Sequence, residues 1–384
     1  MFGNVAPSLC SRRGCHVSTK LHEIRQETLF GEETLGRALP VVGEQKDIRY
    51  YGTVARSVLN GPETTGMGYW SVNPYVGCAF GCAYCYARYT HGWVLDRQAT
   101  AHPELADVQS DRHTLPPWLA FERRIFVKLN AADALRKVLR HGSEKHAALL
   151  EGESIVIGTA TDPYQPAERR FRITRSVLEV LADHPGLTIG IITKSPLITR
   201  DVDVLRRIAR HSSLSIHISL ITVDRDLARR LEPRAPTPEA RLRALRRLRE
   251  HDLEVGINVM PVLPGITDAH AQLDDLVKAL AASGASYVST CALRLRSSAR
   301  QRYLPFIERE FPHLAKRYWA TYAYDHRVST GYSERLSSVM RSLCERHGVP
   351  YGYPNDDDES DDGTPTPTPL TEQLDLPLLS STAI

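Results

Sequence analysis

The apolar positions of the chain alternate between short continuous runs and longer stretches with helical spacing. Continuous apolar runs bounded by turn residues predict six strands: 71–77, 154–160, 187–194, 214–220, 253–263 and 286–294. Stretches whose apolar residues recur every three or four positions predict helices: 131–141, 173–184, 201–211, 238–252 and 269–284. A short extended piece is predicted at 124–129. Strands and helices therefore alternate along most of the chain.

This alternation indicates an α/β fold with a parallel sheet covered by helices, because the predicted strands are apolar on both faces. Six strand–helix units are two short of a closed eight-stranded barrel. We therefore expect a partial (β/α)6 TIM-type barrel of parallel strands. Periodicity alone does not separate this fold from a doubly wound sheet.

The two ends of the chain differ from its middle. Residues 1–45 show weak periodicity and are expected to form a poorly ordered N-terminal leader. Residues 46–350 hold the predicted barrel and, from about residue 300, aromatic-rich helices that form a C-terminal cap. Residues 351–384 become acidic and then rich in Thr and Pro, a composition that buries too little apolar surface to fold. We expect a disordered tail there.

Composition narrows the class of protein. The chain has 384 residues, 42% of them hydrophobic, which is enough for a large core. No apolar run approaches the length of a membrane span. The N-terminal residues show no apolar stretch followed by a cleavage site. We therefore expect a cytoplasmic protein with no membrane partner.

The charge of the chain is unevenly distributed. The formal net charge is +3, but residues 355–384 hold eight acidic side chains and no Lys or Arg, so residues 1–354 carry +11. A basic body attracts polyanions such as DNA. Arginines on solvated helix faces produce the same excess, so charge alone does not identify the partner.

One tight cysteine cluster follows the first predicted strand. Cys78, Cys82 and Cys85 have the spacing C-x3-C-x2-C, and the chain has seven cysteines in all. Three thiolates on one loop suit three irons of a [4Fe–4S] cubane and leave the fourth iron open. A zinc site is the alternative, with His91 as the nearby fourth ligand. A chance grouping of cysteines is the second alternative.

Further candidates come from the geometry of β/α folds, in which ligands bind at the carboxyl ends of the strands. A lysine after an apolar strand, Lys194, suits a carboxylate or a phosphate, or else extends to solvent. Asn258, inside a strand, is either a ligand or a polar residue satisfied by its neighbours. Glu232-Pro233-Arg234 either shapes the entrance of the site or forms a surface turn, and the turn is slightly favoured. The candidate cofactor-binding residues are Tyr84, Thr161, Asp162, Lys194, Ser219 and Asn258.

The motif C-x3-C-x-aromatic-C at the start of a parallel β/α domain resembles the radical S-adenosylmethionine (SAM) superfamily. Further motifs resemble the subgroup that includes spore photoproduct lyase, often labelled DNA repair photolyases, over about residues 50–325. These motifs are N-P-Y-x-G-C before the cluster, C-Y-A-R after it, T-D-P-Y-Q (161–165), I-T-K-S (192–195) and P-V-L-P-G-I-T-D (261–268).

The resemblance implies a set of cofactors and roles. Cys78, Cys82 and Cys85 would hold a [4Fe–4S] cluster whose open iron binds SAM. One electron, from a donor such as flavodoxin or ferredoxin, would cleave SAM to a 5′-deoxyadenosyl radical that abstracts a hydrogen atom from the substrate. Lys194 would meet the SAM carboxylate, with hydrogen bonds from Thr161 and Ser219.

One departure from the subgroup affects the expected activity. Spore photoproduct lyases carry a cysteine near the end of the second strand, which returns a hydrogen atom to the product radical. Residues 158–162 contain no cysteine here. Cys291 is the candidate catalytic substitute, or else a small core residue. We therefore expect a radical SAM enzyme that is not a strict photoproduct lyase, with DNA as a candidate substrate in a repair-like reaction.

Two alternatives to a DNA-directed enzyme stay open from the sequence. One is a radical SAM enzyme that modifies a protein, a peptide or a small molecule. The other is a non-catalytic metal-binding adaptor. The segment from Gln373 to Leu378 bears on this choice, because it resembles the short peptide by which bacterial repair proteins bind the DNA polymerase sliding clamp. An apolar plug on a flexible arm suits a groove on such a partner.

Overall fold

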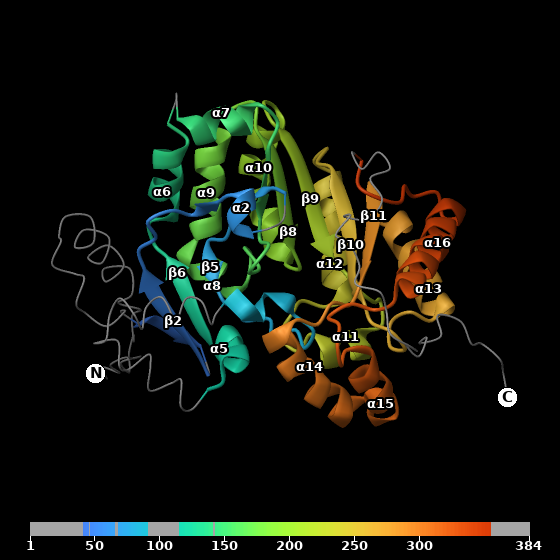
Figure 1. Ribbon diagram of the computed structural model, residues 1–384. Coiled ribbons are helices and arrows are strands. Elements are labelled where there is room, and N and C mark those ends of the chain that lie inside the picture. Colours follow the sequence, from blue (N-terminus) through green and yellow to red (C-terminus); the bar gives the residue numbers. More distant parts are fainter. Residues whose placement is uncertain (1–40, 46, 66–67, 91–114, 141–142, 355–384) are drawn as a thin grey trace, which may run out of the picture.

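The larger sheet of the protein has seven strands in the order β11-β10-β9-β8-β7-β4-β3. The computed structural model describes residues 41–45, 47–65, 68–90, 115–140 and 143–354 (Figure 1). Six strands of this sheet are parallel: β4 (Trp70–Val72), β7 (Ser154–Ile157), β8 (Thr188–Thr193), β9 (Ser213–Ser219), β10 (Val255–Val262) and β11 (Tyr287–Ala292). Strand β3 (Leu59–Asn60) adds an antiparallel edge to β4.

The order of the parallel strands follows the order of the chain without reversal. A doubly wound sheet reverses its strand order at a switch point, so the observed order distinguishes the two folds. Among the described residues, β11 and β3 are the two edges of the sheet and do not pair with each other. The predicted six-stranded partial barrel of TIM type is therefore confirmed.

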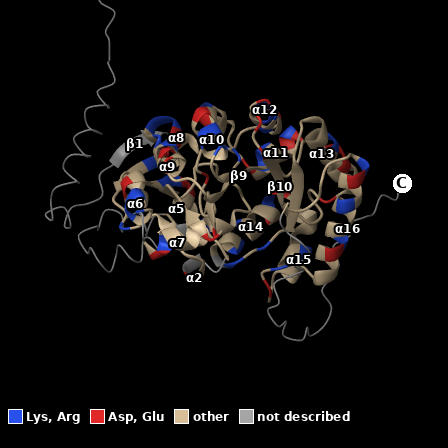
Figure 2. Ribbon diagram, turned by 90° about the horizontal axis from the view of Figure 1, so that it is seen from above, with Lys and Arg blue, Asp and Glu red and all other residues tan. Residues whose placement is uncertain are grey.

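Helices connect the strands and cover the sheet. Helix α10 (Val202–Ala209) illustrates the pattern, because Val204, Leu205 and Ile208 are buried while Arg206 and Arg207 face solvent. The other connecting helices are α6 (Ala131–Val138), α7 (Glu144–Leu150), α8 (Pro166–Phe171), α9 (Ile173–Ala182), α11 (Arg225–Leu231), α12 (Pro238–Arg249) and α13 (His270–Ala282). Figure 2 shows basic and acidic residues together on outward-facing helices such as α10 and α16.

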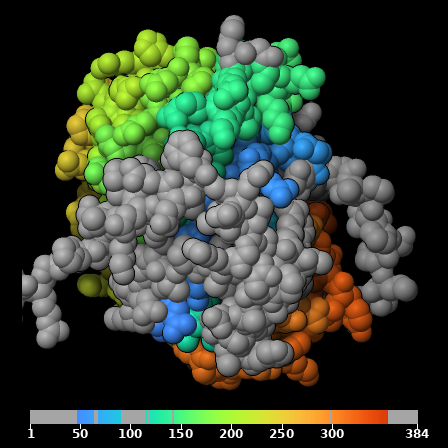
Figure 3. Space-filling view, turned by 90° about the vertical axis from the view of Figure 1, so that its left-hand side faces the viewer, coloured from blue at the N-terminus to red at the C-terminus, as the bar shows by residue number. Residues whose placement is uncertain are grey.

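A second, smaller sheet lies beside the barrel in the order β1-β2-β6-β5. Figure 3 shows the early part of the chain (blue) between the green part and the orange C-terminal part. This sheet is mixed: two of its strands precede β4, and the other two lie between β4 and β7 in the chain. Its strands are β1 (Val41–Gln45), β2 (Ile48–Thr53), β5 (Tyr75–Val76) and β6 (Arg124–Lys128).

Of three expectations about this region, two need correction and one is confirmed. The single strand predicted at 71–77 is two strands in different sheets, because Pro74 lacks the N–H that would continue the ladder. The extended piece expected at 124–129 is confirmed as β6, which belongs to the smaller sheet. Strand β1 lies within the segment expected to be a poorly ordered leader, where it pairs with β2. Residues 1–40 lie outside the described residues.

The cap predicted after residue 300 is helical, as expected. Helices α14 and α15 pack against each other, and α14 also contacts α5 and the short helix η2. Figure 1 shows α14 and α15 at the carboxyl ends of the sheet strands, while α16 lies beside α13 and β11. The elements are η2 (Tyr86–Arg88), α5 (Pro117–Arg123), α14 (Ser297–Glu310), α15 (Pro312–Thr321) and α16 (Thr330–Arg346).

Within the described part of the chain, no helix has the length and apolar content needed to cross a membrane. The tail from residue 355, with the segment from Gln373 to Leu378, lies outside the described residues, as does His91.

Candidate cluster and cofactor site

The three cysteines of the motif lie on the loop between β5 and η2. Cys78 and Cys82 are buried and Cys85 is partly exposed. The Cys78 amide donates to the Phe121 carbonyl over 2.9 Å, and the Ala83 amide donates to the Leu231 carbonyl over 2.9 Å. Backbone contacts from α5 and from the end of α11 therefore fix the loop on two sides.

Two glycines allow this loop to turn. Gly77 has φ +84° and Gly81 has φ +67°, a region that L side chains rarely adopt. A Cβ on Gly77 would lie 2.6 Å from the Phe121 carbonyl oxygen, so the loop packs on α5 only with glycine there. The motif thus requires glycine at these turns as well as the three cysteines.

The motif T-D-P-Y-Q supplies hydrogen bonds to the same loop. Gln165, fully buried, accepts from the Ala79 amide and donates to the Gly77 carbonyl, both over 3.0 Å. The Thr161 hydroxyl donates to the Gly77 carbonyl over 2.6 Å and accepts from Gln165 over 3.0 Å. Thr161 therefore holds the loop that carries the cysteines. Gln165 was missed from the sequence, although it lies within a motif that was recognised.

The segment Glu232-Pro233-Arg234 is a turn, as favoured from the sequence, but only Pro233 is exposed. Glu232 is 2% exposed. Arg234 Nε donates to the Ala79 carbonyl over 2.6 Å, and its amide donates to the Phe80 carbonyl over 3.2 Å. This segment closes over the cysteine loop, and proline between two charged residues gave no local sign of burial.

Glu232 joins several of the predicted residues. Its carboxylate accepts a hydrogen bond from the Tyr84 hydroxyl and pairs with Arg241. Lys194 Nζ lies 3.9 Å from Glu232 Oε1 and 5.8 Å from the centre of the Tyr84 ring. Arg241 Nη1 also donates to the Ser219 carbonyl over 3.0 Å. The structure thus brings Tyr84, Lys194 and Ser219 together around a carboxylate that the sequence analysis did not place in the site.

Electrostatics keep this buried carboxylate ionised. Burial by itself raises the pKa of Glu232, but the positive charges of Arg241 and then Lys194 outweigh it, and the pKa lies below the usual value. The guanidinium of Arg241 is equally buried, with 1% of its side chain exposed. Such a pair is stable only with both partners present.

Asp162 ties the end of β7 to the end of β8. Its carboxylate accepts from the Thr193 hydroxyl and from the Lys194 amide, each over 2.7 Å, and from the Tyr164 amide over 2.9 Å. Burial raises the pKa of Asp162, while these hydrogen bonds lower it. Asp162 therefore fixes the backbone at Lys194 and so the direction from which the lysine enters the site.

Two predicted residues lie further along the sheet. Asn258 pairs in register with Ser219 of β9 and accepts from the Tyr353 hydroxyl over 3.2 Å. Cys291 on β11 is partly exposed, and its thiol donates to the Ala292 carbonyl over 3.2 Å. Burial raises the pKa of Cys291, and Arg294 beside it lowers the pKa. In the described structure no hydrogen bond or ion pair joins Cys291 to the Glu232 group.

A second buried charge group lies on the other side of the loop. Arg88, fully buried, donates to the Cys82 carbonyl over 2.7 Å and lies 3.4 Å from Glu122. Arg234 and Arg302 reach the same carboxylate, at 2.7 and 3.7 Å. One carboxylate therefore faces three guanidinium groups, and the surroundings of the loop are cationic.

These features fit a cluster held by three thiolates. Burial raises the pKa of Cys78 to about 12, and bound iron would supply the positive charge that keeps such a thiol deprotonated. Burial also raises the pKa of Cys85, and the positive charge of Arg88 favours its thiolate form. No three His, Cys, Asp or Glu side chains in the described ranges converge on a single ion. In a cubane each thiolate binds its own iron, so a common point is not needed.

Comparisons with known proteins agree with this assignment. The family model described as the radical SAM superfamily matches residues 72–277. An uncharacterised protein of Mycobacterium tuberculosis (strain H37Rv) is 31% identical over 322 residues, covering 83% of this chain and 87% of the relative. An uncharacterised protein of Methanocaldococcus jannaschii is 26% identical over 214 residues, covering 56% and 68%.

A solved structure shares the fold. A mutant of spore photoproduct lyase with bound AdoMet and dinucleoside spore photoproduct superposes with a TM-score of 0.58. It is 15% identical, and the match covers 88% of this chain and 94% of that one. Enzymes of the matched family use a [4Fe–4S] cluster and SAM. With more than half of its residues in the family match and a 31% identical relative along most of its length, the chain belongs to the radical SAM superfamily and is an enzyme.

Proposed function

We propose that this radical SAM enzyme acts on DNA. The observation that carries the proposal is the charge at the rim of the site, where residues 294–327 hold eight Lys or Arg and three acidic residues. Two exposed aromatic side chains, Trp319 and Tyr324, lie in the same segment. Cationic and aromatic side chains together are typical of surfaces that bind nucleic acid.

The likeness to spore photoproduct lyase supports this proposal. That protein was solved with a dinucleoside photoproduct, and its fold extends over 88% of this chain. We propose DNA in general as the substrate and not that photoproduct in particular, because residues 158–162 lack the cysteine that spore photoproduct lyases carry there. A protein, a peptide or a small molecule is the alternative substrate, and hydrogen transfer from DNA distinguishes DNA from these alternatives.

In the proposed reaction, the motif cysteines and Lys194 bind different groups. Cys78, Cys82 and Cys85 would hold the cluster, which with SAM supplies a 5′-deoxyadenosyl radical for hydrogen abstraction. Lys194, directed by Asp162 and Glu232, would bind the SAM carboxylate.

Further residues complete the proposed site. Tyr84, Ser219 and Asn258 would line the SAM side of the sheet, and Thr161 would fix the loop. Cys291 is the proposed thiol that returns a hydrogen atom, and it lies one residue before the carboxyl end of β11.

Hydrogen transfer from labelled DNA tests the proposal. The anaerobically reconstituted chain should bind about four irons and, once reduced, cleave SAM to 5′-deoxyadenosine. With ultraviolet-damaged DNA carrying deuterium on its sugars and thymine methyl groups, deuterium should appear in 5′-deoxyadenosine. The Cys82→Ala variant should show neither cleavage nor transfer. SAM cleavage without any transfer from damaged or intact DNA would refute the DNA proposal and favour a protein, a peptide or a small molecule as substrate.

Two partners are proposed with this function. An electron donor such as flavodoxin or ferredoxin would reduce the cluster. The segment from Gln373 to Leu378 would bind the DNA polymerase sliding clamp and bring the enzyme to DNA. A peptide of residues 368–384 should bind purified clamp, and Gln373→Ala should weaken that binding. An absence of binding at high micromolar concentration would exclude the clamp as partner.

A further inference from the structure

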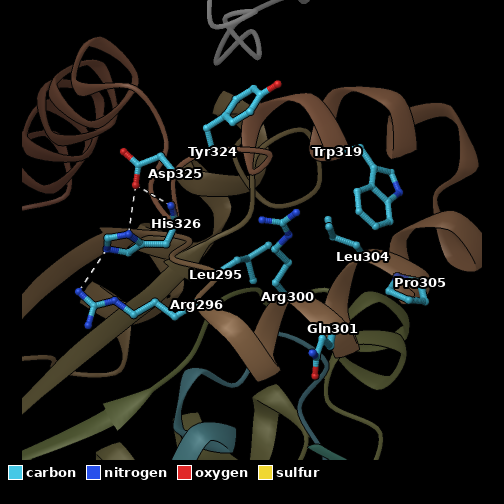
Figure 4. Close-up of a pocket in the computed structure, with 10 residues that line it drawn as sticks. All are labelled: Leu295, Arg296, Arg300, Gln301, Leu304, Pro305, Trp319, Tyr324, Asp325 and His326. Atoms are coloured by element: carbon cyan, nitrogen blue, oxygen red, sulfur yellow. Dashed lines mark hydrogen bonds and ion pairs between the residues drawn. The ribbon is translucent and has the colours of Figure 1, made fainter. Parts of the chain in front are cut away.

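A pocket of about 800 Å³ opens between α14, the end of α15 and the segment that follows it (Figure 4). Two arginines, a histidine and two aromatic side chains are among its lining residues. The backbone links its two walls, because the Leu295 amide donates to the His326 carbonyl over 2.7 Å. The lining residues are Leu295, Arg296, Arg300, Gln301, Leu304, Pro305, Trp319, Tyr324, Asp325 and His326.

The arginines of the pocket keep most of their hydrogen-bonding capacity. Arg296 Nη2 contacts His326 Nε2 at 3.3 Å, and Arg300 Nη1 donates to the Ala323 carbonyl over 3.1 Å. A guanidinium has five N–H donors, so each side chain retains donors for an anion. Burial and the charge of Arg296 lower the pKa of His326, which is therefore neutral and accepts from the arginine at neutral pH.

Asp325 does not neutralise these arginines. Its carboxylate accepts from the His326 and Arg327 amides, at 2.5 and 3.1 Å, and lies 3.1 Å from His326 Nδ1. Figure 4 shows Asp325 and Arg296 on opposite sides of the His326 ring. The one acidic residue of the lining thus belongs to its own turn, and the pocket is cationic.

Two aromatic side chains flank Arg300 at the rim (Figure 4). Tyr324 is fully exposed, at 103%, and Trp319 is 42% exposed. Trp319 is held in place by its Nε1–H, which donates to Glu308 over 2.7 Å. Exposed aromatic rings beside arginines suit unpaired nucleobases, because a base can stack on the free face of such a ring while the arginines bind the phosphates.

The pocket adjoins the proposed radical site. Helix α14 packs against η2, which directly follows Cys85. Tyr89 lies just after η2. Burial raises its pKa, and the pocket residue Arg296 is near enough for its positive charge to lower the pKa in part. At the start of the same segment, Arg294 lies beside Cys291. A strand held in this pocket would therefore pass close to the cysteine loop and to β11.

We infer that this pocket binds an unpaired segment of the DNA substrate, with phosphates on Arg296 and Arg300 and a base stacked on Tyr324 or Trp319. The inference rests on the proposed function and adds where and how the nucleic acid is held. It also predicts a preference for unpaired over fully paired DNA, because a base within a duplex does not present its face to Tyr324.

Oligonucleotide binding tests the inference with the full-length reconstituted chain. The probes are a fluorescein-labelled oligothymidylate of about 20 nucleotides and a duplex of the same length, followed by anisotropy over a range of KCl concentrations. Tyr324→Ala should weaken oligothymidylate binding about fivefold or more, and Tyr324→Phe should retain it because the ring remains. Arg296→Gln with Arg300→Gln should reduce the salt slope by about 0.7 for each phosphate that the arginines no longer neutralise.

Matched controls separate a loss of binding at the pocket from a general loss of positive charge or of the folded enzyme. Arg246→Gln with Arg247→Gln removes the same charge from the exposed side of α12 and should leave binding within twofold of the unmodified chain. Iron content and SAM cleavage without DNA should be unchanged in all pocket variants. If the chain binds oligothymidylate but the pocket variants bind equally well, the inference fails and the proposed function stands. If the unmodified chain binds neither DNA probe, both fail. Equal competition by polyglutamate would also overturn the nucleotide assignment.

Discussion

The hydroxyl of Tyr84 donates a hydrogen bond to Glu232, which lies 148 residues further along the chain. Tyr84 stands between two cysteines of the motif, and Glu232 follows α11. The same carboxylate pairs with Arg241 and lies 3.9 Å from Lys194 Nζ. The loop for the cluster and the lysine proposed for SAM are therefore positioned by one buried carboxylate.

Removal of this carboxylate should destabilise the protein strongly. Glu232→Ala leaves the Arg241 guanidinium buried without its partner, and breaking a buried ion pair in this way costs about 3–5 kcal/mol. Urea unfolding followed by circular dichroism measures the loss in the free energy of unfolding. Asp183→Ala is the control, because its pair with Arg207 is exposed and should contribute under about 1 kcal/mol. Equal losses in the two variants would contradict the role of Glu232.

The strands of the sheet were predictable because each one is a local apolar run. Strand β8, expected at 187–194, is Thr188–Thr193. The run at 71–77 failed because hydrophobicity does not record which sheet a residue joins, and Pro74 interrupts the ladder between β4 and β5. The order of the strands along the chain could be predicted from the sequence. That β5 belongs to the smaller sheet could not, because it depends on pairing with β6.

The site was predictable to the extent that its chemistry is local. The three cysteines share one loop, and Lys194 and Asp162 each follow an apolar strand. Glu232 could not be assigned, because a buried charge is recognisable only from its partner, and Arg241 lies on the next helix. The resemblance of motifs pointed to the family, but the hydrogen bonds of the cysteine loop became visible only in three dimensions.

Loss of one motif cysteine should abolish the cluster without unfolding the chain. Cys82→Ala removes one of three thiolates, and the reconstituted protein should then hold far fewer than about four irons and lack the broad visible absorption of the cluster. Cys344→Ala is the matched control, since Cys344 is a fully buried free cysteine on α16, away from the motif. Cys291→Ala should likewise keep its iron. Normal iron content in Cys82→Ala would rule out this thiol as a ligand.

Lys194 should contribute to SAM binding rather than to cluster assembly. Lys194→Met keeps an apolar stem over the Tyr84 ring but removes the charge, and a lost hydrogen bond to a charged group costs about 1.5–3 kcal/mol. We expect SAM affinity, measured by equilibrium dialysis on the reconstituted enzyme, to fall about tenfold or more. Iron content should not change. Lys278→Met, on the exposed side of α13, is the control, and a similar affinity in both variants would leave Lys194 without a role in binding.

Asp268 should make the stability of the chain depend on pH. The side chain is 3% exposed and accepts from the Tyr332 hydroxyl over 2.9 Å and from the Gly265 amide over 2.8 Å. Burial raises its pKa to about 6, although the bond from Tyr332 lowers it in part. The folded state thus holds this proton more tightly than the unfolded chain, whose Asp pKa is about 3.9.

The sign of the effect follows from that difference. The contribution of Asp268 to stability is fully present below about pH 4 and is lost as the pH rises through about 6, amounting to about 3 kcal/mol at most. Roughly half of this loss falls between pH 5 and pH 8, where denaturant unfolding of the chain can be measured. Asp268→Asn carries no titrating group and keeps an oxygen for the Gly265 amide, so its stability relative to the unmodified chain should rise over that interval. Asp275→Asn, exposed on α13, removes the same charge and should show no such rise. A constant difference between Asp268→Asn and the unmodified chain from pH 5 to 8 would mean that the buried carboxyl does not titrate there.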